Sequence, residues 1–141
     1  RLHDIVAVIR AIGMPRGNVE AFDPADAARS AKAVLALHAG LRDRAVTISS
    51  SAGPIRVHRW MFVRAVVALA CRVAAADRTT SITISLSDRD GWVYVIADGA
   101  THTARSAFLD EIAAALGGET LPDAAGFRVP SLVTLRRREG L

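Results

Sequence analysis

Residues 81–97 read SITISLSDRDGWVYVIA, and this stretch decides the fold class. Apolar side chains alternate with serine and threonine over 82–86, which is the period of a strand with one buried face. The loop at 88–91 then turns the chain, and residues 92–97 return as a second strand. The stretch therefore predicts a β-hairpin.

The segment before the hairpin has the period of a helix. Apolar residues recur at i, i+3, i+4, i+7, i+10 and i+11, at Val63, Val66, Val67, Ala70, Val73 and Ala74. This spacing draws one apolar stripe along a helix over 58–76, and the stripe predicts that the helix packs on a sheet.

Further elements lie on both sides of this pair. We expect helices over 24–41 and 104–116, strands over 46–50 and 127–135, and short extended stretches at 18–22, 55–57 and 119–121. The helix over 24–41 starts with an N-cap and a proline at Asp23-Pro24, and its buried side is expected to carry Ala27, Ala31, Val34, Leu35 and Leu37. So few crossovers cannot cover both faces of a sheet. The fold class is therefore an α+β, two-layer sandwich with a mixed sheet and three helices on one face.

Composition fits a single soluble domain. The chain has 141 residues, of which 51% are apolar and 23% charged, a globular balance. The apolar segment 60–76 is interrupted by Arg64 and Arg72, so we expect no membrane contact, and the lone Cys71 fits a cytoplasmic setting as a small buried residue. The net charge of +4 is spread along the chain, apart from the arginines at 136–138, which we interpret as a solvated tail.

Three stretches resemble the ATP-binding domain of sensor histidine kinases, the GHKL or Bergerat fold. They are DPADAA at 23–28, LRDRAVTI at 41–48 and VVALACR at 66–72. The end of the chain, with ALGGE at 115–119, is similar to the last helix, the double-glycine stop and the closing strands of that domain. The resemblance covers residues 18–138 and implies a Bergerat-type sandwich in a bacterial two-component system.

The resemblance divides the chain into two parts. Residues 18–141 form the ATPase-like domain, and residues 1–17 form an N-terminal helix and linker that ends at a glycine and a proline. We expect this helix to be the end of a preceding dimerisation segment in a longer protein, through which a homodimer could form. The pair His3-Asp4 is similar to a phosphoacceptor histidine followed by an acid, and this interpretation stays open beside a plain helix end.

The second long helix lacks the magnesium ligands that the resemblance implies. In the family, this helix carries asparagines four residues apart that hold the ion and the phosphates. Ala68 and Arg72 occupy the matching positions, with Arg64 one turn earlier. Alanine has no ligand atom, and arginine is a permanent cation without an acceptor. We therefore expect no metal site.

The adenine-binding turn of the family, Asp-x-Gly-x-Gly, is matched only in part by DGATH at 98–102. Asp98 takes the place of the carboxylate that accepts from the adenine amino group, but Gly99 comes one position early. Residues 100–104 then lead straight into the last helix, and five residues are too few for the glycine-rich lid of the family. Without metal ligands, glycines and lid, phosphoryl transfer lacks positioning and charge neutralisation. No catalytic residue is expected.

The residual pocket would consist of Asp98, Gly99, Arg64, Ala68 and Arg72. The three helix residues recur every four positions, so they share one flank of the helix. A guanidinium left without a partner in a closed pocket is costly, so we expect Arg72 to lie against Asp98 or to reach an anion from solvent.

The leading hypothesis is a two-component signalling module, in which a degenerate ATPase-like domain is a docking or regulatory scaffold for a response regulator or a histidine kinase domain. It needs no cofactor. An alternative is an active ATP-binding catalytic domain that retains residual ATP binding, with Asp98 at the adenine and Arg72 at the phosphates. A basic nucleic-acid-binding domain is the least favoured, because the charge is scattered and not interleaved with aromatic residues.

Overall fold

The structure is a computed structural model that describes residues 19–38, 44–76, 81–98, 100 and 106–132. Its helices are α2 (Pro24–Leu35), α3 (Arg59–Ala76) and α4 (Ala107–Ala115). Its strands are β1 (Val19–Phe22), β2 (Ala45–Ser50), β3 (Ile55–His58), β4 (Ser81–Arg89), β5 (Trp92–Asp98), β6 (Glu119–Thr120) and β7 (Gly126–Pro130).

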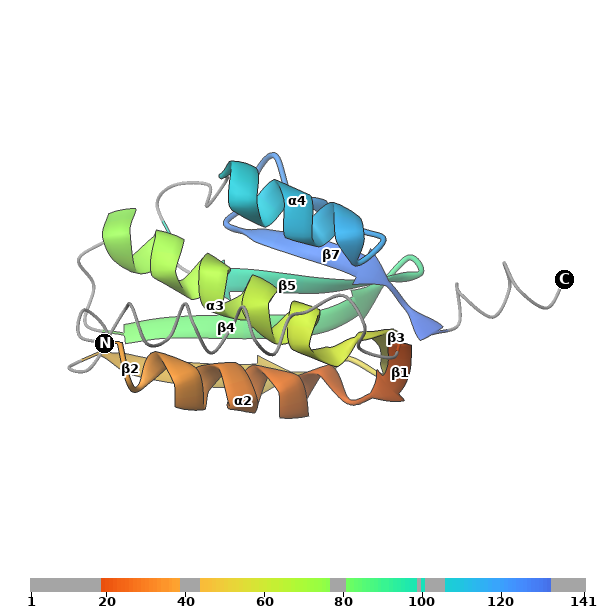
Figure 1. The fold of residues 1–141 in the computed structure, drawn as a ribbon, viewed down its shortest axis with the longest axis horizontal. Helices are drawn as coiled ribbons and strands as arrows, with labels where there is room; N and C mark the ends of the chain where they lie inside the picture. The colour runs from red at the N-terminus through yellow and green to blue at the C-terminus, as the bar shows by residue number, and fades with distance from the viewer. Residues whose placement is uncertain (1–18, 39–43, 77–80, 99, 101–105, 133–141) are drawn as a thin grey trace, which may run out of the picture.

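These strands form two sheets. β1 and β3 pair antiparallel, and the larger sheet has the order β2-β4-β5-β7-β6. Within it β2 runs parallel to β4, whereas the other neighbours are antiparallel. Figure 1 shows α2, α3 and α4 on the same side of this sheet, and within the described ranges no helix covers its other face. The predicted two-layer α+β sandwich with a mixed sheet is confirmed.

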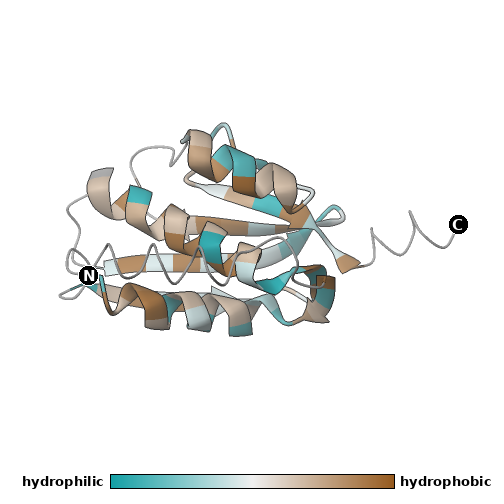
Figure 2. Cartoon of the chain, viewed as in Figure 1, coloured by the Kyte–Doolittle hydropathy of each residue, from teal (hydrophilic) through white to brown (hydrophobic). Residues whose placement is uncertain are grey.

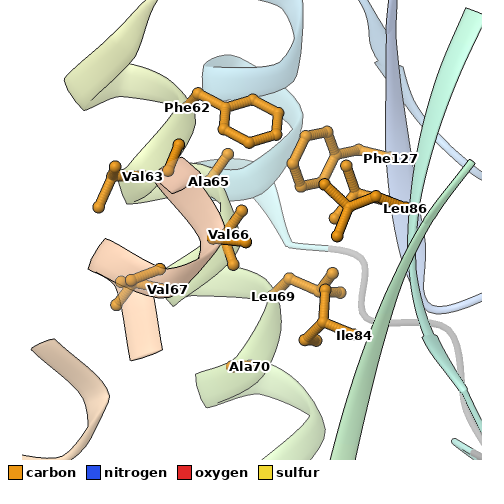
Figure 3. Packing of buried hydrophobic residues seen from close by; sticks show 14 of the residues in the cluster. Phe62, Val63, Ala65, Val66, Val67, Leu69, Ala70, Ile84, Leu86 and Phe127 are labelled. Atoms are coloured by element: carbon orange, nitrogen blue, oxygen red, sulfur yellow. The ribbon is translucent and has the colours of Figure 1, made fainter. Parts of the chain in front are cut away.

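Helix α3 is the centre of the packing between the layers. Figure 3 shows Phe62, Val66 and Leu69 pointing toward Ile84, Leu86 and Phe127 of the strands. Of the stripe predicted to lie on the sheet, Val63 and Val67 point away from these strands, so that part of the prediction was wrong. The ring of Phe62 meets the rings of Phe22 and Phe127 edge to face, with both centroid distances at 5.9 Å, a favourable aromatic geometry. In Figure 2 α3 is brown with isolated teal bands, so it is apolar on most of its surface.

Alternation along the strands separates the two faces of the large sheet. Six buried side chains of β4 and β5 belong to the core beneath the helices, namely Ile82, Ile84, Leu86, Val93, Val95 and Ala97. Because successive side chains point to opposite faces, the residues between them lie on the face that none of the described helices covers. We call this the open face.

The end of α4 depends on two glycines. Gly117 has a φ of +82°, a left-handed conformation that closes many helices. A Cβ atom on Gly118 would lie 1.7 Å from the carbonyl oxygen of Arg128 in β7. The Gly-Gly pair therefore ends the helix and lets β7 approach it closely.

Several expected boundaries shift. α2 ends at Leu35 rather than at residue 41, and Leu37, expected on its buried side, is 64% exposed. The last strand ends at Pro130, where the amide of Ser131 donates to the carbonyl of Gly91. The expected helix within 1–17 and the region beyond 132 lie outside the described residues.

Within those same ranges, every helix is too short or too polar to cross a membrane.

Candidate functional site

The candidate site lies on the flank of α3 that carries Arg64, Ala68 and Arg72. The helical repeat places one residue per turn on this flank, as expected from the sequence. Arg64 and Ala68 are half-buried, and Arg72 is exposed. The other sides of α3 hold the core, and Ala68 of the flank packs against that core while it is partly exposed.

Arg64 is enclosed between α3 and α4. Its guanidinium carbon lies 5.4 Å from the ring centroid of Phe108, a cation–π contact between the two helices. Its Nε atom is buried and has no hydrogen-bond partner in the part of the chain that the structure describes. This end of the flank therefore holds the ring of Phe108 and the buried Nε donor of Arg64, which has no partner among the described residues.

The N-terminus of α4 brings Phe108 to this position. Ser106 is the N-cap residue, and its hydroxyl accepts a hydrogen bond from the backbone amide of Leu109 at 3.1 Å. Leu109 and Ile112 are buried in the core, which turns Phe108 toward α3 with 47% of its surface exposed. The sequence pattern assigned Phe108 only to the helix and missed this contact.

Asp98 lies on the other side of the sheet from α3. It is the last residue of β5, exposed, and opposite Thr83 in the register with β4. Its carboxylate accepts a hydrogen bond from the hydroxyl of Ser85, a residue of the open face. Asp98 therefore does not share a face with Arg64 and Arg72.

The helix side of the end of β5 is taken by Ala97, which is 3% exposed and part of the core. If Ala97 stands at the place of the carboxylate in Asp-x-Gly-x-Gly, then Gly99 falls at the first glycine, two residues later. This register places Gly99 correctly, whereas the carboxylate position is an alanine and the second glycine position is Thr101. Gly99 itself lies outside the described residues.

The expected contact between Arg72 and Asp98 is not formed. No ion pair or hydrogen bond of the described residues joins the two side chains, and Asp98 is bonded to Ser85 instead. The physical reason is the strand period: Asp98 comes one residue after a helix-facing position, so its side chain points to the open face.

The chemistry of the flank is that of cations and small apolar groups. Arginine and alanine offer no metal ligand, and the described ranges contain no cluster of histidine, cysteine, aspartate or glutamate that could hold a metal ion. Cys71, next to the flank, was expected to be buried but is half-buried. Burial still raises the pKa of its thiol, so it is a poor nucleophile.

Comparison with solved structures identifies the architecture. Histidine kinase AdeS of Acinetobacter baumannii matches with a TM-score of 0.64 at 14% identity, over 93% of this chain and 77% of that one. The catalytic domain of histidine kinase ThkA matches with 0.60 at 13% identity, over 81% and 96%. The ATP-binding domain of PrrB from Mycobacterium tuberculosis matches with 0.57 at 14% identity, over 80% and 97%.

At these identities the likeness concerns the fold. No protein-family model matches the sequence, and no curated protein is significantly similar to it. The chain has the fold of the histidine kinase ATP-binding domain, as the sequence resemblance implied.

Proposed function

We propose that this chain is a histidine-kinase-type domain of a two-component system that acts in the cytoplasm as a docking or regulatory scaffold and not as a phosphotransfer catalyst. Its partner in this role is a response regulator or a histidine kinase domain. The fold supports the link to histidine kinases. The composition of the α3 flank supports the loss of catalysis.

The observation that carries the proposal is the chemistry of four side chains, three on the flank of α3 and one at the end of β5 on the side of the sheet that faces the helices. Arg64, Ala68 and Arg72 on α3 and Ala97 on β5 supply no carboxylate or amide oxygen for a magnesium ion or an adenine amino group. Kinase chemistry depends on such groups for positioning and for neutralising phosphate charge.

A second function, residual nucleotide binding without magnesium, is favoured by one feature. The buried Nε of Arg64 has no partner in the described structure, and Arg72 is an exposed cation eight residues further along the same flank. Two guanidinium groups can bind phosphate oxygens directly. This mode would bind nucleotide but would not transfer a phosphoryl group.

Calorimetry with ATP separates the two functions. The scaffold proposal expects no heat of binding from ATP with Mg²⁺ or from ATP with a chelator. The residual mode expects binding in chelator that weakens when Arg64→Met and Arg72→Gln are combined, with Arg29→Gln on α2 as the control. Binding that requires Mg²⁺, together with autophosphorylation of the longer protein, would overturn both.

A further inference from the structure

The open face of the large sheet carries an arginine–aromatic cluster near the β4–β5 hairpin. In the register of the sheet, Trp92 lies opposite Arg89 of β4, and Tyr94 lies opposite Arg128 of β7. Arg128 lies in turn opposite Glu119 of β6. Four strands thus bring these five residues to one side of the sheet, which we call the open-face cluster.

Each arginine of the cluster is stacked on an aromatic ring. The guanidinium carbon of Arg128 is 4.0 Å from the ring centroid of Trp92, and that of Arg89 is 4.4 Å from the ring centroid of Tyr94. Arg128 also donates a hydrogen bond to the Tyr94 hydroxyl at 3.1 Å. Stacking holds a guanidinium in one orientation, so less conformational freedom is lost when its N–H groups bind a partner.

The two arginines differ in their anionic partners. Arg128 forms an ion pair with Glu119, whose side chain is 57% exposed. Arg89 is exposed and pairs with no carboxylate among the residues that the structure describes. Nearby Asp88 belongs to the helix side of the strand, where its carboxylate accepts from the amide of Gly53 at 2.7 Å. This excess of positive charge also acts on the hydroxyl of Tyr94. The pKa of the hydroxyl is lowered, mainly by the hydrogen bond from Arg128 and also by Arg89.

We propose that the open-face cluster is a docking surface for an acidic surface of a protein partner. Arg89 supplies an oriented, unneutralised guanidinium for a carboxylate, and Arg128 supplies a second one when a partner carboxylate competes with Glu119. Trp92 and Tyr94 form the rigid support. The inference rests on the proposed scaffold function, because it says where such a scaffold binds its partner.

A protein partner fits this cluster better than a nucleic acid does. Tyr94 is only 9% exposed beneath the guanidinium groups, so its ring is not available for a base to stack on. The adjoining part of the open face carries hydroxyl groups, such as those of Thr47, Thr83 and Ser85, and ends at the carboxylate of Asp98. Among the residues of this face that the structure describes, a long phosphate backbone would meet that carboxylate and few further cations.

The test titrates the whole chain with a short peptide of alternating glutamate and glycine, followed by heteronuclear NMR. The peptide should shift the indole N–H signal of Trp92 and leave that of Trp60, on α3, in place. Arg89→Gln should weaken binding roughly threefold, as expected for one exposed ion pair. Arg29→Gln, which removes an exposed arginine on α2, is the matched control and should change binding little.

Two further arms sharpen the outcome. Glu119→Gln should tighten binding because it releases Arg128, whereas Glu111→Gln on α4, with the same change in charge, should not. The proposal is overturned if a glutamine–glycine peptide binds equally well, if Arg29→Gln weakens binding as much as Arg89→Gln, or if oligouridylate displaces the acidic peptide from the Trp92 site. Magnesium-dependent ATP binding would overturn the scaffold function alone, and the peptide titration reads out the cluster separately.

Discussion

The two sides of α3 have opposite compositions although they belong to one helix. One side buries Phe62, Val66 and Leu69 against the sheet with almost no exposed surface. The flank has Arg64 and Arg72 where the resembling family has polar ligands for a nucleotide. The difference teaches that the core of this sandwich is packed by the side of α3 that faces the sheet, so the composition of the flank can change while the core stays intact.

The largest loss of stability is expected when the ring of Phe62, on the side of α3 that faces the sheet, is removed. The variant Phe62→Ala deletes a fully buried ring that contacts both Phe22 and Phe127, and the free energy of unfolding should fall by about 3–5 kcal/mol. Urea denaturation measures the change. Trp60→Ala, a partly exposed aromatic on the same helix, is the control and should cost clearly less; equal losses would contradict the division of α3 into two sides.

The same substitution on each side gives a second contrast. Ala65 is fully buried, and Ala65→Leu should lower the free energy of unfolding by about 1–3 kcal/mol through overpacking. Ala68 is half-buried on the flank, and Ala68→Leu should stay within about 0.5 kcal/mol of the original chain. Thermal unfolding of the two variants measures both losses of stability. A larger loss for Ala68→Leu than for Ala65→Leu would mean that the flank is packed as tightly as the core.

Arg64 tests whether the flank adds to stability at all. Arg64→Met keeps an unbranched apolar chain against Phe108 and removes a buried donor that lacks a partner. We expect the free energy of unfolding to stay the same or to rise by up to about 1 kcal/mol. Chemical denaturation provides the value, with Arg72→Met as the exposed control. A loss above about 2 kcal/mol would show that Arg64 has a partner that matters.

The variant Arg72→Asn tests whether one asparagine at a matching position is enough to restore magnesium-dependent ATP binding. Arg72 is exposed, so stability should change by less than about 0.5 kcal/mol. Under the proposed scaffold function, calorimetry should still detect no binding of ATP with Mg²⁺, because Ala68 and Ala97 carry no acceptor group. Recovery of magnesium-dependent binding in this single variant would refute that explanation.

Cys71 gives the smallest effect, through pH. Burial raises the pKa of its thiol in the folded chain above the unfolded value, so the folded state holds this proton more tightly. Its contribution to stability is present below the unfolded pKa and is lost as the pH rises through the folded one. Urea midpoints should fall more between about pH 8 and pH 10 for the original chain than for Cys71→Ala. Identical pH profiles would argue against a raised pKa of this half-buried thiol.

The elements of the sandwich could be predicted because local patterns encode them. The alternation at 82–86 and the stripe from Val63 to Ala74 follow from single-strand and single-helix periods. Leu37 was misplaced, yet the sequence held the information. It comes two residues after Leu35 and so lies about 200° around the helix from it, away from the stripe that continues from Ala31 to Leu35.

The candidate site was predicted less well, for two different reasons. Asp98 was placed by motif alone, although the alternation of Val93, Val95 and Ala97 already assigns it to the opposite face. The open-face cluster could not have been predicted, because Tyr94 and Arg128 meet only through the register of two strands that are distant in the sequence. Pairing between distant strands depends on tertiary packing and leaves no local signal.

The parallel pairing of β2 with β4 has a consequence for the synthesis of the chain on the ribosome. Ala45 faces Ser81, so each residue of β2 pairs with one that is 36 positions further along. At ribosomal speeds of about 5–20 residues per second, β2 is made roughly two to seven seconds before the strand it pairs with. During that interval it can pair with other nascent chains. The strand β2 is polar at every second position and at its end, through Thr47, Ser49 and Ser50. This polarity lowers the tendency of the unpaired strand to aggregate before β4 is synthesised.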